Sequence, residues 1–266
     1  MPVSDEAAAL AGRGVLVTRP PRQAWRLARA LQRHGARVLR FALVEIAAPA
    51  DPNAAQAGLA RLERSDLVIF VSANAVRFAA QLLPDLPARL DRTCIACVGD
   101  ATASALQTIG APVHVVPREA STSEALLAQD ALQHASVHGR EVAIVRGEGG
   151  RELLARALEE RGARVSVIEV YRREPPHGDL PAFLDVHAAD IDLGIVTSGE
   201  ALRRLATLGG MQRVRAMPLV LPSDRVLEQA VSLGFAGPFS VPRRMNDDEL
   251  VAAAGRLAVS LAGGRA

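Results

Sequence analysis

The chain has 266 residues, of which 49% are hydrophobic and 23% charged, and its formal net charge is +2. These values are typical of a globular protein with one large or two ordinary domains. There is no lysine, so all 31 basic residues are arginine, which excludes lysine Schiff-base and pyridoxal-phosphate chemistry and the phosphate-binding loop that ends in Lys-Ser/Thr. An aromatic content of 3% and the weak net charge also disfavour nucleic-acid binding. Arginine pairs well with carboxylates and phosphates, so an anionic ligand is compatible with the composition.

Targeting signals are absent from the sequence as given. No run approaches the length of a membrane span, and residues 1–12, which include Asp5 and Glu6, lack the apolar core of a signal peptide. Two cysteines are too few for a secreted disulfide framework. We therefore expect a cytoplasmic protein without a membrane partner.

The predicted elements alternate between strands and helices. In chain order they are a strand at 14–18, a helix at 23–34 that ends at Gly35, an extended segment at 37–46, a strand at 66–71, a helix at 73–83, a strand at 93–98, a helix from Gly99 to before Gly110, a strand at 113–116 and a helix at 123–135. Such alternation predicts parallel sheets with helices on both faces.

An internal repeat organises the chain. Residues 27–38 recur as residues 154–165 at an offset of 127, and residues 66–72 recur as residues 192–198 at an offset of 126. Val116-Pro117-Arg118 likewise matches residues 241–243 at an offset of 125. We interpret the chain as two related α/β halves, about 14–138 and 141–266, with ligands expected in a cleft at the carboxyl ends of the strands.

Small polar residues, glycines and arginines follow the predicted strands in both halves. Backbone amides at such positions can hold an anion. A helix cap is the better explanation of any single serine, threonine or asparagine, but both halves carry the pattern on what should be the same face. The glycine-rich turn at residues 147–151 is not a dinucleotide motif, but it lets a polar ligand approach the backbone. The predicted binding residues are Arg19, Ser72, Asn74, Gly99, Thr102, Thr122, Arg146, Gly147, Gly149, Thr197, Ser198 and Ser223.

Two other pairs do not indicate a metal site. Cys94 and Cys97 lie in a predicted strand, where their side chains face opposite sides, so we expect buried structural cysteines. His134 and His138 have the spacing of a metal pair but lack the acidic partner of a zinc motif, so we expect surface histidines. No metal ligand is predicted.

An ordered set of blocks resembles the uroporphyrinogen-III synthase family. The blocks are residues 14–20, 70–76, the Val-Gly-x-x-Thr-Ala sequence at 98–103, Arg146-Gly147 and residues 170–172. The resemblance implies two similar, duplicated α/β lobes, each a doubly wound parallel sheet, joined by a two-stranded antiparallel linker. With the repeat, it predicts one lobe at 46–165, a discontinuous lobe at 1–37 plus 174–266, and a linker at 38–45 and 166–173.

The resemblance also implies an activity. Family members are lyases of heme biosynthesis that act on hydroxymethylbilane, a linear tetrapyrrole with eight carboxylates. They remove its terminal hydroxyl as water and close the ring to uroporphyrinogen III with ring D inverted, through a proposed spirocyclic pyrrolenine and without a metal or organic cofactor. A monomer is expected, and a transient contact with the preceding or following enzyme of the pathway is left open.

Tyr171 is the catalytic residue that the resemblance implies. It is the only tyrosine, and its repeat equivalent is Val44, so the phenol departs from the pattern of the two halves. A phenol can donate a proton to the departing hydroxyl near neutral pH. The alternative is an ordinary strand tyrosine, and the alternative function is a non-catalytic module that binds tetrapyrroles or other anions. A DNA-binding regulator is disfavoured, because no helix-turn-helix segment is evident.

Overall fold

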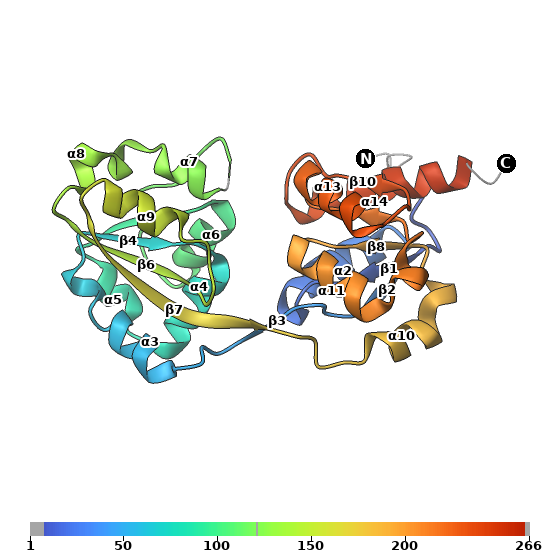
Figure 1. Cartoon of the computed structure of the whole chain (residues 1–266), viewed down its shortest axis with the longest axis horizontal. Coiled ribbons are helices and arrows are strands. Elements are labelled where there is room, and N and C mark those ends of the chain that lie inside the picture. Colours follow the sequence, from blue (N-terminus) through green and yellow to red (C-terminus); the bar gives the residue numbers. More distant parts are fainter. Residues whose placement is uncertain (1–7, 121, 264–266) are drawn as a thin grey trace. The chain divides into compact units, whose positions relative to one another are not determined.

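The computed structural model describes residues 8–120 and 122–263 (Figure 1). The chain divides into two compact units. Unit 1 comprises Met1–Glu45 with Glu174–Ala266, and unit 2 comprises Ile46–Arg173. Each sheet in the described residues has five strands, and none of the described helices is long and apolar enough to cross a membrane.

The sheet of unit 1 has the order β10-β9-β8-β1-β2, and its neighbouring strands are parallel. Val15 and Val17 point to one face of the sheet, where α2 and α14 cover them in one hydrophobic core. The strands are β1 (Gly14–Val17), β2 (Arg37–Arg40), β8 (Leu193–Ile195), β9 (Leu219–Val220) and β10 (Phe239–Ser240). The helices are α2 (Pro21–Arg33), α10 (Leu180–His187), α11 (Gly199–Gly209), α12 (Met211–Val214), α13 (Asp224–Leu233) and α14 (Asp247–Gly263).

The sheet of unit 2 has the order β3-β7-β6-β4-β5, with β7, β6, β4 and β5 mutually parallel. Its strands are β3 (Glu45–Ala47), β4 (Leu67–Phe70), β5 (Cys94–Cys97), β6 (Glu141–Gly147) and β7 (Arg164–Glu174). Its helices are α3 (Pro52–Leu59), α4 (Ala73–Leu82), α5 (Leu86–Leu90), α6 (Asp100–Thr108), α7 (Ser123–Leu127), α8 (His134–Val137) and α9 (Leu153–Glu160).

The inner strand β4 is apolar because both faces of the sheet are covered there. Val68 and Phe70 of β4 face the core formed with α3 to α6, whereas Leu67 and Ile69 face the core formed with α7 to α9. These two groups of helices therefore cover opposite faces of the sheet. The α/β fold with parallel sheets predicted from the sequence is confirmed.

A β-bulge interrupts the pairing of β6 with β7. The register shifts between Arg146, which faces Glu169, and Gly147, which faces Tyr171. As a result Val170 and Tyr171, although consecutive, both belong to the core formed with α3 to α6. A regular strand would send these two side chains to opposite faces, so the bulge decides where the phenol lies.

Two predicted elements differ in the structure. The strand at 113–116 is reduced to a single bridge between Ala96 and Val115. The helix at 123–135 is broken into α7, a 3₁₀ turn (Asp130–Leu132) and α8. Side chains replace the helical hydrogen bonds there, because Arg161 Nη1 donates to the carbonyls of Leu127 (2.9 Å) and Leu132 (2.6 Å).

The expected linker at 38–45 and 166–173 also requires correction. Val38 to Arg40 pair with β1 in parallel, so they belong to the sheet of unit 1. Ser166 to Tyr171 pair with β6 in parallel and belong to the sheet of unit 2. Both segments were expected in the linker because they are equivalent in the repeat, but residues 38–40 and 166–171 instead pair with β1 and β6 inside the sheets of their own units. The chain passes from one unit to the other at Glu45/Ile46 and Arg173/Glu174.

Candidate active site

The carboxyl ends of the strands of unit 2 border a cavity of about 250 Å³. Its lining includes Ser123, Gly147, Gly149, Tyr171 and Arg173. Three of these are residues that the sequence singled out. Their convergence follows from the parallel sheet, in which the ends of β6 and β7 meet at one edge.

Tyr171 is the aromatic group of this cavity. The residue is only 2% exposed, and its ring stacks on that of Phe78 of α4 with centroids 5.8 Å apart. The guanidinium carbon of Arg173 lies 5.8 Å from the ring centroid. The Tyr171 hydroxyl lies 3.2 Å from Ser72 Oγ, so the phenol has a hydrogen-bond partner inside the protein. Packing on both sides holds the ring in one orientation.

Gly147 provides the space for this ring. A Cβ atom at position 147 would lie 2.5 Å from Tyr171 Cζ and 2.9 Å from its hydroxyl oxygen, closer than non-bonded atoms approach. The absence of a side chain at residue 147 therefore lets the tyrosine ring lie against the backbone of β6. In the following turn, Gly149 has a φ of +63°, a conformation that favours glycine.

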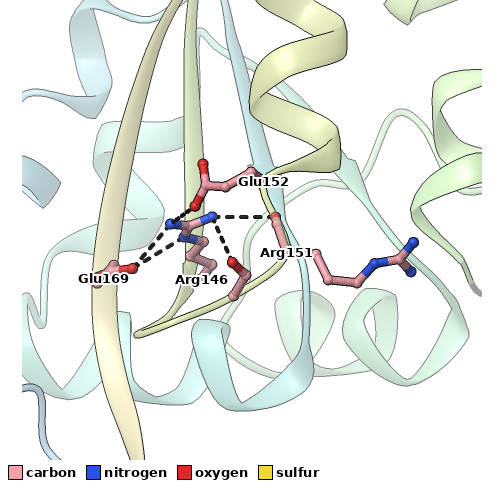
Figure 2. Close-up of polar contacts among 5 residues, drawn as sticks. Arg146, Arg151, Glu152 and Glu169 are labelled. Carbon is pink, nitrogen blue, oxygen red and sulfur yellow. Dashed lines mark hydrogen bonds and ion pairs between the residues drawn. The ribbon is translucent and has the colours of Figure 1, made fainter.

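Arg146 is engaged by protein groups (Figure 2). Its Nη2 lies 2.6 Å from Glu152 Oε1 and 3.2 Å from Glu169 Oε1. Its Nη1 donates to the carbonyls of Gly150 and Arg151, each at 3.3 Å. Arg146 thereby ties the glycine-rich turn to the neighbouring strand β7, and Figure 2 shows the Arg151 side chain pointing away from this cluster.

Glu124 and Arg151 join the turn to α7. Arg151 Nη2 lies 2.5 Å from Glu124 Oε1, and both side chains are more than half exposed. The backbone N–H of Glu124 itself, followed by Arg151, lowers the pKa of the Glu124 carboxyl below its ordinary value. The pair is thus charged at neutral pH and lies next to the cavity-lining residue Ser123.

The remaining predicted residues of unit 2 lie at helix starts. Thr122 caps α7 through a 3.1 Å bond from the Ala125 amide. Asn74 lies in the first turn of α4, and Gly99 precedes α6, inside which Thr102 is 5% exposed. These residues do not line the cavity at Tyr171.

The predicted residues of unit 1 are arranged in a similar way at the ends of its own strands. Ser198 caps α11 through a 3.1 Å bond from the Ala201 amide, and Thr197 precedes it. Ser223 precedes α13 without a side-chain capping bond. Arg19 Nη1 lies 2.6 Å from Asp247 Oδ1 at the start of α14, so this guanidinium is paired within unit 1.

The sequence prediction missed the partners of the arginines, together with Ser123 and Arg173. Glu169 faces Arg146 across β6 and β7, but it fell in the segment expected to form the linker, so the sequence did not place it beside Arg146. The sequence pattern does not predict the other two contacts. Glu152 contacts Arg146 because of the path of the glycine-rich turn, and Asp247 contacts Arg19 because of where α14 begins.

The cysteines lie on opposite sides of β5, as predicted. Cys94 packs against the core formed with α7 to α9, whereas Cys97 belongs to the core formed with α3 to α6. Both are free thiols, and burial raises the pKa of each. The rings of His134 and His138 lie 4.9 Å apart, and the described residues contain no group of three or more histidine, cysteine or acidic side chains that could hold a metal ion.

Comparisons with known proteins agree with this architecture. The uroporphyrinogen-III synthase of Salmonella typhimurium is 36% identical over 196 residues, which cover 73% of this chain and 79% of that protein. The Escherichia coli enzyme is 33% identical over 196 residues, with the same coverage. A solved structure of a mutant Thermus thermophilus synthase shares the fold with a TM-score of 0.61 at 19% identity, and the match covers 93% of this chain and 99% of that one. The Helicobacter pylori enzyme also has a TM-score of 0.61, at 16% identity, and the match covers 94% of this chain and 99% of that one. The family profile described as "Uroporphyrinogen-III synthase HemD" matches residues 26–252, and the chain therefore belongs to the uroporphyrinogen-III synthase family.

Proposed function

We propose that this protein is a lyase that converts hydroxymethylbilane to uroporphyrinogen III, with loss of water and inversion of ring D. Family membership over residues 26–252 carries this proposal, because it extends over most of both units. The position of Tyr171 in a cavity at the strand ends is consistent with it.

In the proposed mechanism Tyr171 protonates the oxygen of the terminal hydroxymethyl group. The carbon–oxygen bond then breaks, its electron pair leaves with the water molecule, and the pyrrole nitrogen lone pair stabilises the resulting azafulvene cation. Ring D attacks this cation through its substituted α-carbon, which gives the spirocyclic pyrrolenine. The bond from that carbon to the bridge on ring C then breaks and leaves a second azafulvene cation on ring C. The free α-carbon of ring D attacks this second cation, and the proton that this carbon loses when aromaticity is restored returns to the phenolate. No net proton is consumed by the enzyme, so Tyr171 acts as a general acid and then as a base.

The substrate's carboxylates need partners, and we propose the strand-end residues for this role in each unit. For Ser72 and Arg146 we propose a different role, because Ser72 is bonded to Tyr171, and Arg146, which lines the cavity, is engaged by Glu152 and Glu169. For Arg146 we propose that it positions the glycine-rich turn rather than touching substrate. The proposed binding residues are Asn74, Gly99, Thr102, Thr122, Gly147 and Gly149 in unit 2, and Arg19, Thr197, Ser198 and Ser223 in unit 1.

We also propose that the two units arose by duplication. When strands are matched through the sequence repeat, β2-β1-β8-β9 of unit 1 corresponds to β7-β6-β4-β5 of unit 2, in the same order. A cytoplasmic location and a monomeric state are proposed from the sequence, as is a transient contact with a neighbouring enzyme of the pathway. Size-exclusion chromatography with light scattering measures the mass in solution.

The decisive experiment is incubation with freshly generated hydroxymethylbilane, followed by oxidation and separation of the porphyrin isomers. We expect the type III isomer in excess over the spontaneous product. Type I alone would overturn the proposal and favour a non-catalytic tetrapyrrole-binding protein.

The role of Tyr171 is tested by Tyr171→Phe, which keeps the ring stacked on Phe78 and removes only the hydroxyl. We expect kcat for type III formation to fall by roughly 10²-fold, the ordinary contribution of a general acid. Residual turnover is expected because holding the substrate in a closing geometry contributes separately. An unchanged kcat would exclude the phenol from the mechanism.

A further inference from the structure

We propose that Ser72 is a positioning residue whose hydroxyl donates a hydrogen bond to the Tyr171 oxygen and so directs the phenolic hydrogen toward the substrate. The sequence predicted Ser72 as a substrate ligand. The inference rests on the proposed function, because it concerns how Tyr171 becomes a proton donor. It rests on the contacts of three groups at the end of β4, the start of α4 and the end of β7.

Ser72 is held in place from the helix side. Its Oγ accepts a 3.1 Å hydrogen bond from the Ala75 amide and thereby caps α4. The same atom lies 3.2 Å from the Tyr171 hydroxyl oxygen. Rotation of the serine side chain would therefore break the helix cap as well as the contact with the phenol.

Tyr171 is held in place from the sheet side. Its ring lies between Phe78 and the backbone at Gly147, where even a methyl group would collide with the hydroxyl-bearing carbon. Neither oxygen can move far, so the hydroxyl–hydroxyl contact is a fixed feature of unit 2. What can change is which of the two oxygens donates the hydrogen.

A hydroxyl has one hydrogen and two lone pairs. The amide of Ala75 takes one lone pair of Ser72, which leaves its hydrogen and its second lone pair for Tyr171. If Tyr171 donates to Ser72, the phenolic hydrogen is occupied inside the protein. If Ser72 donates, the phenolic hydrogen is released for an acceptor in the cavity, and only this arrangement allows transfer to the leaving hydroxyl.

The same bond becomes stronger as the reaction proceeds. When the proton leaves Tyr171, its oxygen gains negative charge, and a hydrogen bond to a charged oxygen is stronger than one to a neutral oxygen. Ser72 thus stabilises the transition state more than the bound substrate. Such an interaction raises kcat and leaves KM nearly unchanged.

The test uses Ser72→Ala, with Ser72→Thr as the conservative variant and Asp179→Ala as the matched control. Asp179 caps α10 through a 3.0 Å bond from the Ala182 amide, so its removal deletes a comparable helix cap away from the cavity-lining residues. For S72A we expect kcat to fall roughly tenfold or more with little change in KM. S72T should restore kcat, and D179A should keep the activity of the wild type.

Two further measurements separate positioning from substrate binding. In a Tyr171→Phe background, S72A should have no additional effect on kcat, because its partner is already absent. Since Tyr171 is the only tyrosine, ¹³C labelling at tyrosine Cζ gives one resonance, which should move in S72A and stay in place in D179A.

Each outcome decides between the interpretations. An equal loss of kcat in the wild-type and Y171F backgrounds, or a Cζ resonance that does not respond to S72A, overturns the inference and returns Ser72 to the substrate-binding set. A wild-type protein that produces only the type I isomer refutes the proposed function instead, and the Cζ resonance still reports whether the Ser72–Tyr171 bond exists.

Discussion

Arg146→Met should destabilise unit 2 because it removes the side chain that ties the glycine-rich turn to β7. The guanidinium is only 11% exposed, whereas its partners Glu152 and Glu169 are 49% and 37% exposed. Water can therefore solvate the two carboxylates once Arg146 is removed. The loss in the free energy of unfolding should then be smaller than the roughly 3–5 kcal/mol expected when a fully buried ion pair is broken. Methionine retains much of the apolar stem, so the change tests the polar contacts.

The magnitude follows from the individual contacts of Arg146. Two partly exposed ion pairs contribute about 0.5 kcal/mol each, and the two bonds to the Gly150 and Arg151 carbonyls contribute about as much apiece. We therefore expect a loss of about 2 kcal/mol in the free energy of unfolding, which is a shift of about 1 M in the urea midpoint. Arg146→Lys should lower the free energy of unfolding by about half as much, because lysine keeps the positive charge but not the planar guanidinium group that donates several hydrogen bonds at once.

The assay is urea unfolding followed through Tyr171, the only tyrosine, which lies in unit 2. Arg164→Met is the matched control: Arg164 pairs with Glu141 between the same two strands, but the side chains are 64% and 47% exposed. Arg164→Met should lower the free energy of unfolding by less than about 0.5 kcal/mol. If R146M unfolds at the same urea concentration as R164M, the assignment of Arg146 to the turn is wrong.

Three other outcomes follow from single contacts. Gly147→Ala places a methyl group 2.5 Å from Tyr171 Cζ, so we expect a loss of about 1–3 kcal/mol in urea unfolding, which a second change, Tyr171→Leu, should reverse without restoring activity. The backbone N–H of Glu141 holds the pKa of the Asp66 carboxyl below its ordinary value, so the unfolded chain takes up that proton first as the pH falls. The stability that Asp66 contributes is therefore present above about pH 4 and lost below it, and urea midpoints of wild type and Asp66→Asn should differ at neutral pH and converge in acid; a difference independent of pH contradicts this. Cys97 is fully buried, and burial raises the pKa of its thiol, so mass spectrometry should show it alkylated only after unfolding; rapid labelling of the native protein would refute its burial.

Local sequence patterns were sufficient to predict an element where the residues of that one segment determine its structure. The apolar run at residues 67–71 lies between Asp66 and Ser72, and Ser72 provides the cap that starts α4, three residues before the Ala75 amide. Strand β4 and helix α4 were accordingly predicted almost to the residue. The helix expected at 123–135 is broken in the structure, where Arg161, far along the chain, donates hydrogen bonds to the carbonyls of Leu127 and Leu132.

The sequence by itself determined the α/β class, the repeat and the family, because these depend on residue order and composition. It could not determine what the arginines do, since Arg146 meets its partners only after two strands align and a turn closes. Nor could it place the phenol beside Ser72 and Gly147. That arrangement depends on one bulge in β7, which shifts the register by one residue and sends Tyr171 to the same face as Val170. Tertiary pairing decides such register, and register decides which side chains meet.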